Sequence, residues 1–120
     1  MQKLRIPLRV VFYEEDGEWV AHCLEFDLVG VGCDKQSAVV QLSDAIHVQL
    51  RATLKSKNLK NLFHPADSEI LQRFAAGVDV AEAECAIEFQ KVDGVVFERT
   101  EARMWRPKPT PRPRRARVIA

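Results

Sequence analysis

The sequence predicts a small α+β domain, in which an antiparallel sheet with a β-β-β-α-β order is covered on one face by one long amphipathic helix. Three observations predict this fold. Two alternating apolar segments flank an Asp-Gly turn, a short glycine-containing strand follows, and apolar residues then recur at helical spacing. At 120 residues, the chain is long enough for one hydrophobic core and too short for two ordinary domains. We therefore expect an α+β domain at residues 1–105 and a Pro/Arg-rich tail at residues 106–120.

The first two strands form the predicted N-terminal hairpin. The first strand is expected over residues 5–13, and its apolar face consists of every second residue: Ile6, Leu8, Val10 and Phe12. Pro7 has no N–H to donate, which places the beginning of this strand at a sheet edge or outside the ladder. Asp16-Gly17 supplies the positive-φ residues of a tight hairpin, and the second strand is expected over residues 19–23.

A short strand and a long helix come next. The strand is expected over residues 29–33, and its two glycines permit close packing from above because they lack side chains. Asp34 is expected to cap the helix that follows, since its carboxylate can accept from the first free N–H groups. The helix should run to about Leu54, with an apolar stripe that covers one sheet face: Ala38, Val39, Leu42, Ala45, Ile46, Leu50 and Leu54.

In the second half of the domain, a polar segment at residues 56–61 is predicted to follow the long helix. A short second helix is predicted from Pro65 through Phe74, with Gly77 as its C-terminal cap. Strand character returns at residues 84–105. There the Asp93-Gly94 pair repeats the hairpin signature, between segments at residues 86–90 and 96–99. Residues 84–105 are therefore expected either to form a separate hairpin or to complete the first sheet.

Charge is distributed unevenly along the chain. Residues 1–105 carry 12 Lys and Arg against 17 Asp and Glu, whereas the tail carries no acid and six cations: Arg106, Lys108, Arg112, Arg114, Arg115 and Arg117. Four prolines within seven residues exclude helix and central strand, so the tail is expected to be disordered and independent of the core. Such a tail would contact nucleic acid through phosphates, without sequence specificity.

The strand–helix region at residues 9–54 resembles the N-terminal domain of HicB antitoxins. The resemblance rests on three motifs: EDGEW at residues 15–19, EFDLVG at residues 25–30 and GCDKQSA at residues 32–38. Family members often continue into a DNA-binding domain, and here a β-rich segment and the basic tail follow instead. The resemblance implies a truncated ribonuclease-H-like fold without catalytic carboxylates, which dimerises and neutralises a small RNA-cleaving HicA toxin. Solitary relatives without a toxin are an alternative. A cytoplasmic location is expected on other grounds, because the odd number of cysteines favours reduced thiols.

The acidic turn is the candidate partner-binding site. A toxin that binds RNA should be basic, so an acidic surface could steer and mask it. The residues assigned to this site are Glu14, Glu15, Asp16, Glu18 and Trp19. The alternative function is a nucleic-acid-associated oligomeric protein that uses the tail. Val20, Val29 and Val31 suggest an apolar sheet edge, so we expect a homo-oligomer, either dimer or tetramer.

Catalytic, metal and cofactor sites are not predicted. The three histidines lack metal-ligand spacing, and His22 and Cys23 should point to opposite faces of one strand. The cysteines fit neither a disulfide framework nor a CxxC site, although a bridge between Cys23 and Cys33 in adjacent strands is conceivable. No signal peptide or membrane span is apparent.

Overall fold

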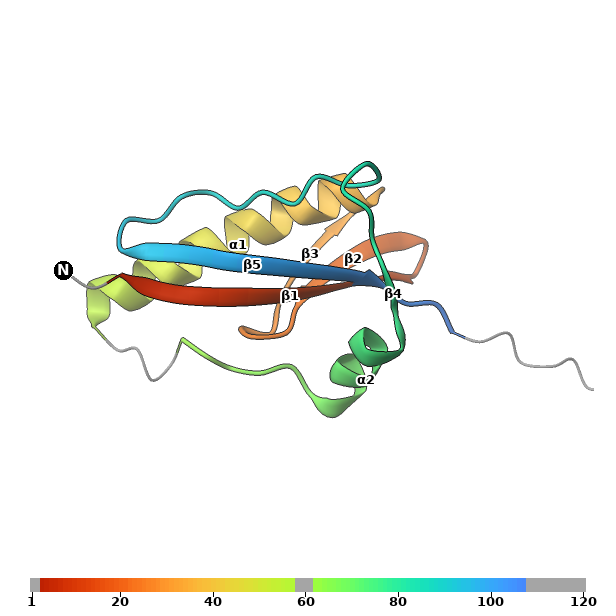
Figure 1. Ribbon diagram of the computed structural model, residues 1–120, viewed down its shortest axis with the longest axis horizontal. Coiled ribbons are helices and arrows are strands. Elements are labelled where there is room, and N and C mark those ends of the chain that lie inside the picture. The colour runs from red at the N-terminus through yellow and green to blue at the C-terminus, as the bar shows by residue number, and fades with distance from the viewer. Residues whose placement is uncertain (1–2, 58–61, 108–120) are drawn as a thin grey trace, which may run out of the picture.

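The computed structural model describes residues 3–57 and 62–107 and confirms the α+β class (Figure 1). One five-stranded sheet has the order β3-β2-β1-β5-β4, with a long and a short helix. In chain order the elements are β1 (Leu4–Glu15), β2 (Glu18–Cys23), β3 (Leu28–Gly32), α1 (Lys35–Ser56), α2 (Ser68–Ala76), β4 (Val78–Asp79) and β5 (Val95–Met104).

The N-terminal hairpin is confirmed. Asp16 and Gly17 have φ values of 52° and 81°, so both central residues of the turn occupy the left-handed region that suits a two-residue hairpin. The ladder pairs Glu15 with Glu18 and continues to Val10 opposite Cys23. This register places alternate residues of β1 on the two faces of the sheet, as the sequence pattern predicts.

The sheet is mixed, so the prediction of an antiparallel sheet is wrong. β5 lies parallel to β1, from Leu4 opposite Val95 to Phe12 opposite Met104, whereas the other neighbouring strands are antiparallel. A parallel pair needs a long crossover, which the helices and the segment before β5 supply. β4, which the sequence pattern did not indicate, pairs through Val78 and Asp79 with the end of β5.

Of the two alternatives for residues 84–105, the structure shows the one in which the segment completes the first sheet, through β5, and not the separate hairpin. The first part, residues 86–90, is extended but belongs to no strand, and it runs beside α1 (Figure 1). Gln36 exchanges two hydrogen bonds with the backbone of Ala86, at 2.8 and 3.0 Å, and the Ser43 hydroxyl accepts from the Gln90 N–H at 2.9 Å. Side chains of the helix therefore satisfy backbone groups that a partner strand would otherwise satisfy.

Pro7 behaves only in part as predicted. It lies inside β1, which is a central strand, but the β2 ladder covers only residues 10–15 of β1. Among the described strands, only β5 pairs with the beginning of β1, and this pairing shifts register between Ile6 and Leu8, at the proline. This irregularity accommodates the missing N–H.

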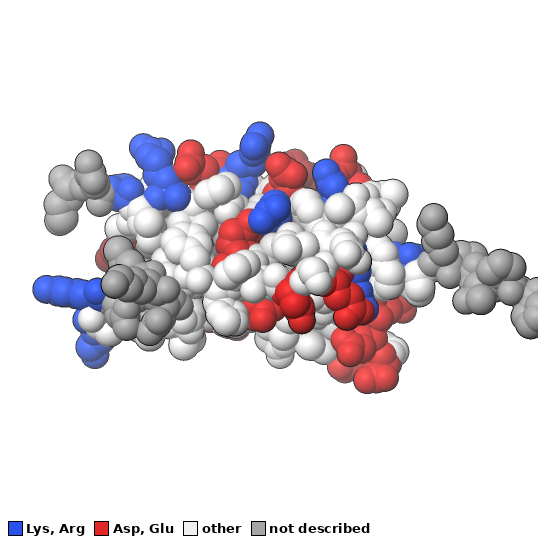
Figure 2. Space-filling model, turned by 90° about the horizontal axis from the view of Figure 1, so that it is seen from below, with Lys and Arg blue, Asp and Glu red and all other residues white. Residues whose placement is uncertain are grey.

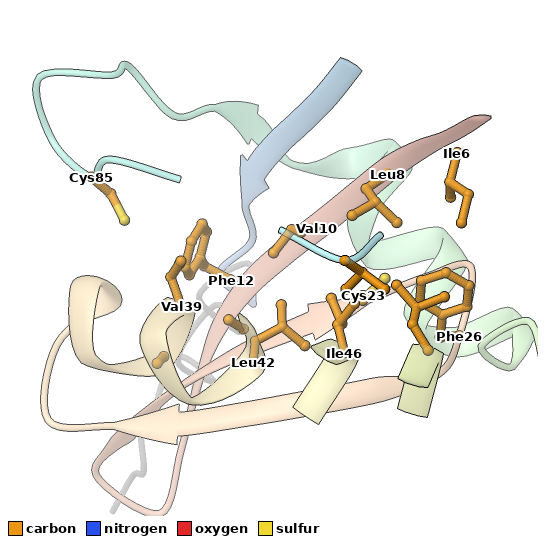
Figure 3. Packing of buried hydrophobic residues seen from close by; sticks show 14 of the residues in the cluster. Ile6, Leu8, Val10, Phe12, Cys23, Phe26, Val39, Leu42, Ile46 and Cys85 are labelled. Atoms are coloured by element: carbon orange, nitrogen blue, oxygen red, sulfur yellow. The ribbon is translucent and has the colours of Figure 1, made fainter. Parts of the chain in front are cut away.

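Apolar residues form a core on each face of the sheet. The larger core lies between the sheet and α1 and includes Val10, Phe12, Leu42 and Ile46 (Figure 3). Cys85 and Val92, on either side of the extended residues 86–90, pack against the edge of this core. On the opposite face, α2 and the segment before it cover a smaller core: Val11, Tyr13, Val20, Leu24, Ala66, Ile70 and Phe74.

The packing of α1 on β3 depends on two glycines, as predicted. A Cβ added at Gly32 would lie 2.6 Å from the Ser37 Cβ, and one added at Gly30 would overlap backbone atoms of Ala38 and Leu42. Asp34 caps α1 by accepting from the Ser37 N–H at 2.7 Å, which lowers the pKa of its carboxyl. Gly77 ends α2 as predicted, but in an extended conformation.

Candidate interaction site

The acidic turn lies at an exposed tip of the sheet. All four predicted acids, Glu14, Glu15, Asp16 and Glu18, are exposed there. Glu15 and Glu18 are directly opposite each other in the ladder. Two carboxylates that face each other across a strand pair repel each other. The hairpin keeps them in these positions, and the repulsion lowers the stability of the folded chain.

Trp19 joins the acidic tip to the core and to the beginning of the tail. Its ring is partly buried against the larger core, and the Lys35 ammonium lies 4.6 Å from the ring centroid. The Arg106 guanidinium lies 5.9 Å from the same centroid and 3.9 Å from a Glu14 carboxylate oxygen. The remaining cations predicted to bind nucleic acid, at positions 108, 112, 114, 115 and 117, lie outside the described residues.

A second polar site, which sequence reasoning missed, lies at the other end of β2. The Tyr13 hydroxyl is 2.8 Å from Nδ1 of His22, and Nε2 of His22 is 2.6 Å from Oδ1 of Asp27. Tyr13 and His22 are buried beside α2, whereas the Asp27 side chain is 35% exposed. Asp27 follows β2 in a turn and has a φ of 52°. The register of the hairpin is enough to predict that Tyr13 and His22 are diagonal neighbours on one face of the sheet. No pattern in the sequence predicts that Asp27 lies beside them.

If the imidazole is neutral, the donors and acceptors of this network are compatible with only one tautomer. An ionised carboxylate can only accept, so Nε2–H of His22 donates to Asp27. Nδ1 must then accept, so the Tyr13 hydroxyl donates to it. Burial raises the pKa of Tyr13, which keeps that proton on the hydroxyl. The network therefore ends in a buried hydroxyl on one side and a partly exposed carboxylate on the other.

The cysteines and histidines do not form a reactive pair. Cys23 faces the α1 core and His22 the opposite face, as predicted. Burial raises the pKa of the Cys23 thiol to about 12. Cys23 lies at the Leu28 end of the β2–β3 ladder and Cys33 follows its other end, so they form no bridge, and all three cysteines are free thiols. Within residues 3–57 and 62–107, no three His, Cys, Asp or Glu side chains lie close enough to share a metal ion.

The predicted apolar edge is smaller than expected. Val20 is buried beneath α2, so it is not part of an exposed edge. Val29, on the edge strand β3, is 43% exposed, and Gln41 of α1 accepts a hydrogen bond from the Val31 N–H. In the described part of the chain, no helix has the length and apolar character needed to cross a membrane.

A scan of the chain against models of protein families, and searches of curated proteins and of solved structures, found no match.

Proposed function

We propose that this chain is a non-catalytic binding protein of the HicB antitoxin type, which binds and masks a small basic RNA-cleaving toxin of the HicA type. The observation that carries the proposal is the acidic tip. Glu15 and Glu18 oppose each other across two strands, with Glu14 and Asp16 beside them. A cationic surface placed on this tip relieves their repulsion, so association gains free energy that the isolated chain lacks.

The arrangement of the elements also supports the proposal. Three antiparallel strands, a helix on one face and a later strand beside the first are compatible with the truncated ribonuclease-H-like fold that the resemblance implies. On the face shown in Figure 2, acidic side chains predominate toward the end from which the tail leaves and basic ones toward the opposite end. This separation favours one orientation of a charged partner.

Co-expression with a short basic chain encoded beside this one tests the proposal directly. We expect a complex that co-elutes in size-exclusion chromatography with light scattering, and that is lost in the variant E15K/E18K. The control E88K/E98K makes the same change in net charge at exposed positions away from the tip. Equal loss of the complex in both variants would mean that net charge, and not the tip, governs binding.

Self-association is a further part of the proposal. β3 is the last strand of the sheet on its side, and Val29 presents an exposed apolar side chain there. An edge strand can pair with the same strand of a second copy. Light scattering of the chain alone should therefore give at least twice the mass of one chain, and V29K should reduce the oligomer to monomer.

A nucleic-acid-associated role is the second candidate function. It is favoured by a hollow of about 610 Å³ at the end of α1, where Arg51, Lys55 and Lys91 face a single acid, Asp93. These cations provide a site for a phosphate backbone, and the tail begins at the opposite end of the molecule (Figure 1). Salt-sensitive binding of single-stranded RNA, lost when residues 106–120 are deleted, would support this role. Complete indifference to RNA at low salt would exclude it.

A further inference from the structure

The turn after β2 borders an open hollow of about 440 Å³ that is separate from the acidic tip. Helix α1 and the segment that precedes α2 complete it. Its apolar walls include Phe26, Leu28 and Phe63, and its polar groups are Asp27, Gln49 and His64. A hollow with aromatic walls and a few convergent polar groups can bind a ligand that is partly apolar and partly polar.

The walls suit a side chain that combines an aliphatic stem with a cationic end. The Phe26 and Phe63 rings lie 5.6 Å apart, and Phe63 is 47% exposed although it is a large apolar residue. Aromatic faces attract guanidinium and ammonium groups, and apolar walls accept the methylene stem of lysine or arginine.

Asp27 gives the hollow its negative charge. One carboxylate oxygen accepts from His22, and no described residue donates to the other. Within residues 3–57 and 62–107, the side chains that line the hollow include no lysine or arginine. The Tyr13–His22–Asp27 network therefore presents a fixed anion to an aromatic pocket.

We infer that this hollow binds the cationic side chain, lysine or arginine, of a protein partner. The inference rests on the proposed function, because a basic partner supplies such a side chain. The hollow and the acidic tip lie at opposite ends of β2, six residues or roughly 20 Å apart. An interface of standard size is wide enough to span this distance, so one partner can reach both.

The test uses n-butylguanidinium as the probe, titrated at about pH 8, where imidazoles are generally neutral, and followed by NMR of the backbone amides. We expect saturable shifts at Gln49, Phe63 and His64, with affinity in the millimolar range that is usual for so small a ligand. Butylurea has the same shape without the charge, and it should bind at least about tenfold more weakly.

Two variants separate binding from folding. Asparagine tolerates the left-handed conformation of residue 27, and its amide oxygen can still accept from His22, so D27N should keep the fold and weaken the probe at least about tenfold. E88Q removes one acid at an exposed position that does not line the hollow, and it should bind the probe as the wild type does.

Each outcome decides the inference. Charge-dependent binding that is lost in D27N alone supports it, and a matching loss in F63A would show that the aromatic wall contributes. Equal binding by D27N, equal binding of butylurea, or no saturation overturns it. If the probe binds but no basic chain co-elutes, the hollow is a cation-binding site and the antitoxin proposal is rejected. If a complex forms but the probe does not bind, the antitoxin proposal stands and the inference about the hollow is rejected.

Discussion

The contact between β3 and α1 should be intolerant of a single added methyl group. In G30A the new Cβ would overlap the Ala38 carbonyl oxygen and the Leu42 backbone, with the Leu42 Cα 2.9 Å away. These are backbone atoms, so no side-chain rotation relieves the overlap, and α1 must move away from the sheet. Gly30 does not have a positive φ. The whole effect is therefore steric.

Overpacking of this kind typically destabilises a domain by about 1–3 kcal/mol. Because the clashing atoms belong to the backbone, G30A should lower the free energy of unfolding by about 3 kcal/mol, at the upper end of this range. With a urea m-value of about 1.5 kcal/mol/M, the unfolding midpoint should fall by about 2 M. The measurement is urea unfolding followed by circular dichroism. The control is G17A, where the added methyl has no neighbour within 4 Å and only the φ of 81° is unfavourable, at about 1 kcal/mol. A G30A midpoint no lower than that of G17A would refute the reasoning.

Three further predictions concern buried polar groups and the helix cap. Y13F should lower stability by about 1–3 kcal/mol in urea unfolding, because Nδ1 of His22 loses its donor; an unchanged midpoint would mean that water replaces the hydroxyl. In the folded protein a thiol reagent should modify the exposed Cys33 quickly and the buried Cys23 only after unfolding, since burial raises the pKa of Cys23 to about 12; mass spectrometry of the modified peptides would show the order. The lowered pKa of Asp34 contributes stability above the ordinary aspartate value of about 3.9, and this is lost as the pH falls through the folded pKa. The urea midpoint of D34N, which keeps a cap that does not titrate, should therefore fall less than that of the wild type between about pH 6 and about pH 3.

The parts of the fold that could be predicted from sequence are those that local rules determine. The hairpin follows from Asp16-Gly17 and the alternation around it, and α1 follows from its cap and apolar stripe. The neighbour of β1 on its other side could not be predicted, because no local pattern distinguishes a parallel from an antiparallel partner. Residues 86–90 have the alternation of a strand, yet their backbone N–H groups donate to the Gln36 and Ser43 side chains, which holds the segment beside α1.

The candidate site divides in the same way. The acidic tip is contiguous in sequence, so composition and turn type were enough to predict that it is exposed. The Tyr13–His22–Asp27 network is assembled from two strands and a turn. Its last member depends on an aspartate in the left-handed region, which the sequence did not indicate.

The parallel pairing of β1 with β5 has a consequence for how the chain folds. Leu4 pairs with Val95, so β1 waits for a partner strand that is synthesised much later. Loop closure over such a separation is slow. Until it occurs, the beginning of β1 exposes unpaired N–H and C=O groups together with side chains that are buried in the folded protein. We expect the hairpin and α1 to assemble first, as a native-like intermediate whose exposed edge invites aggregation during translation.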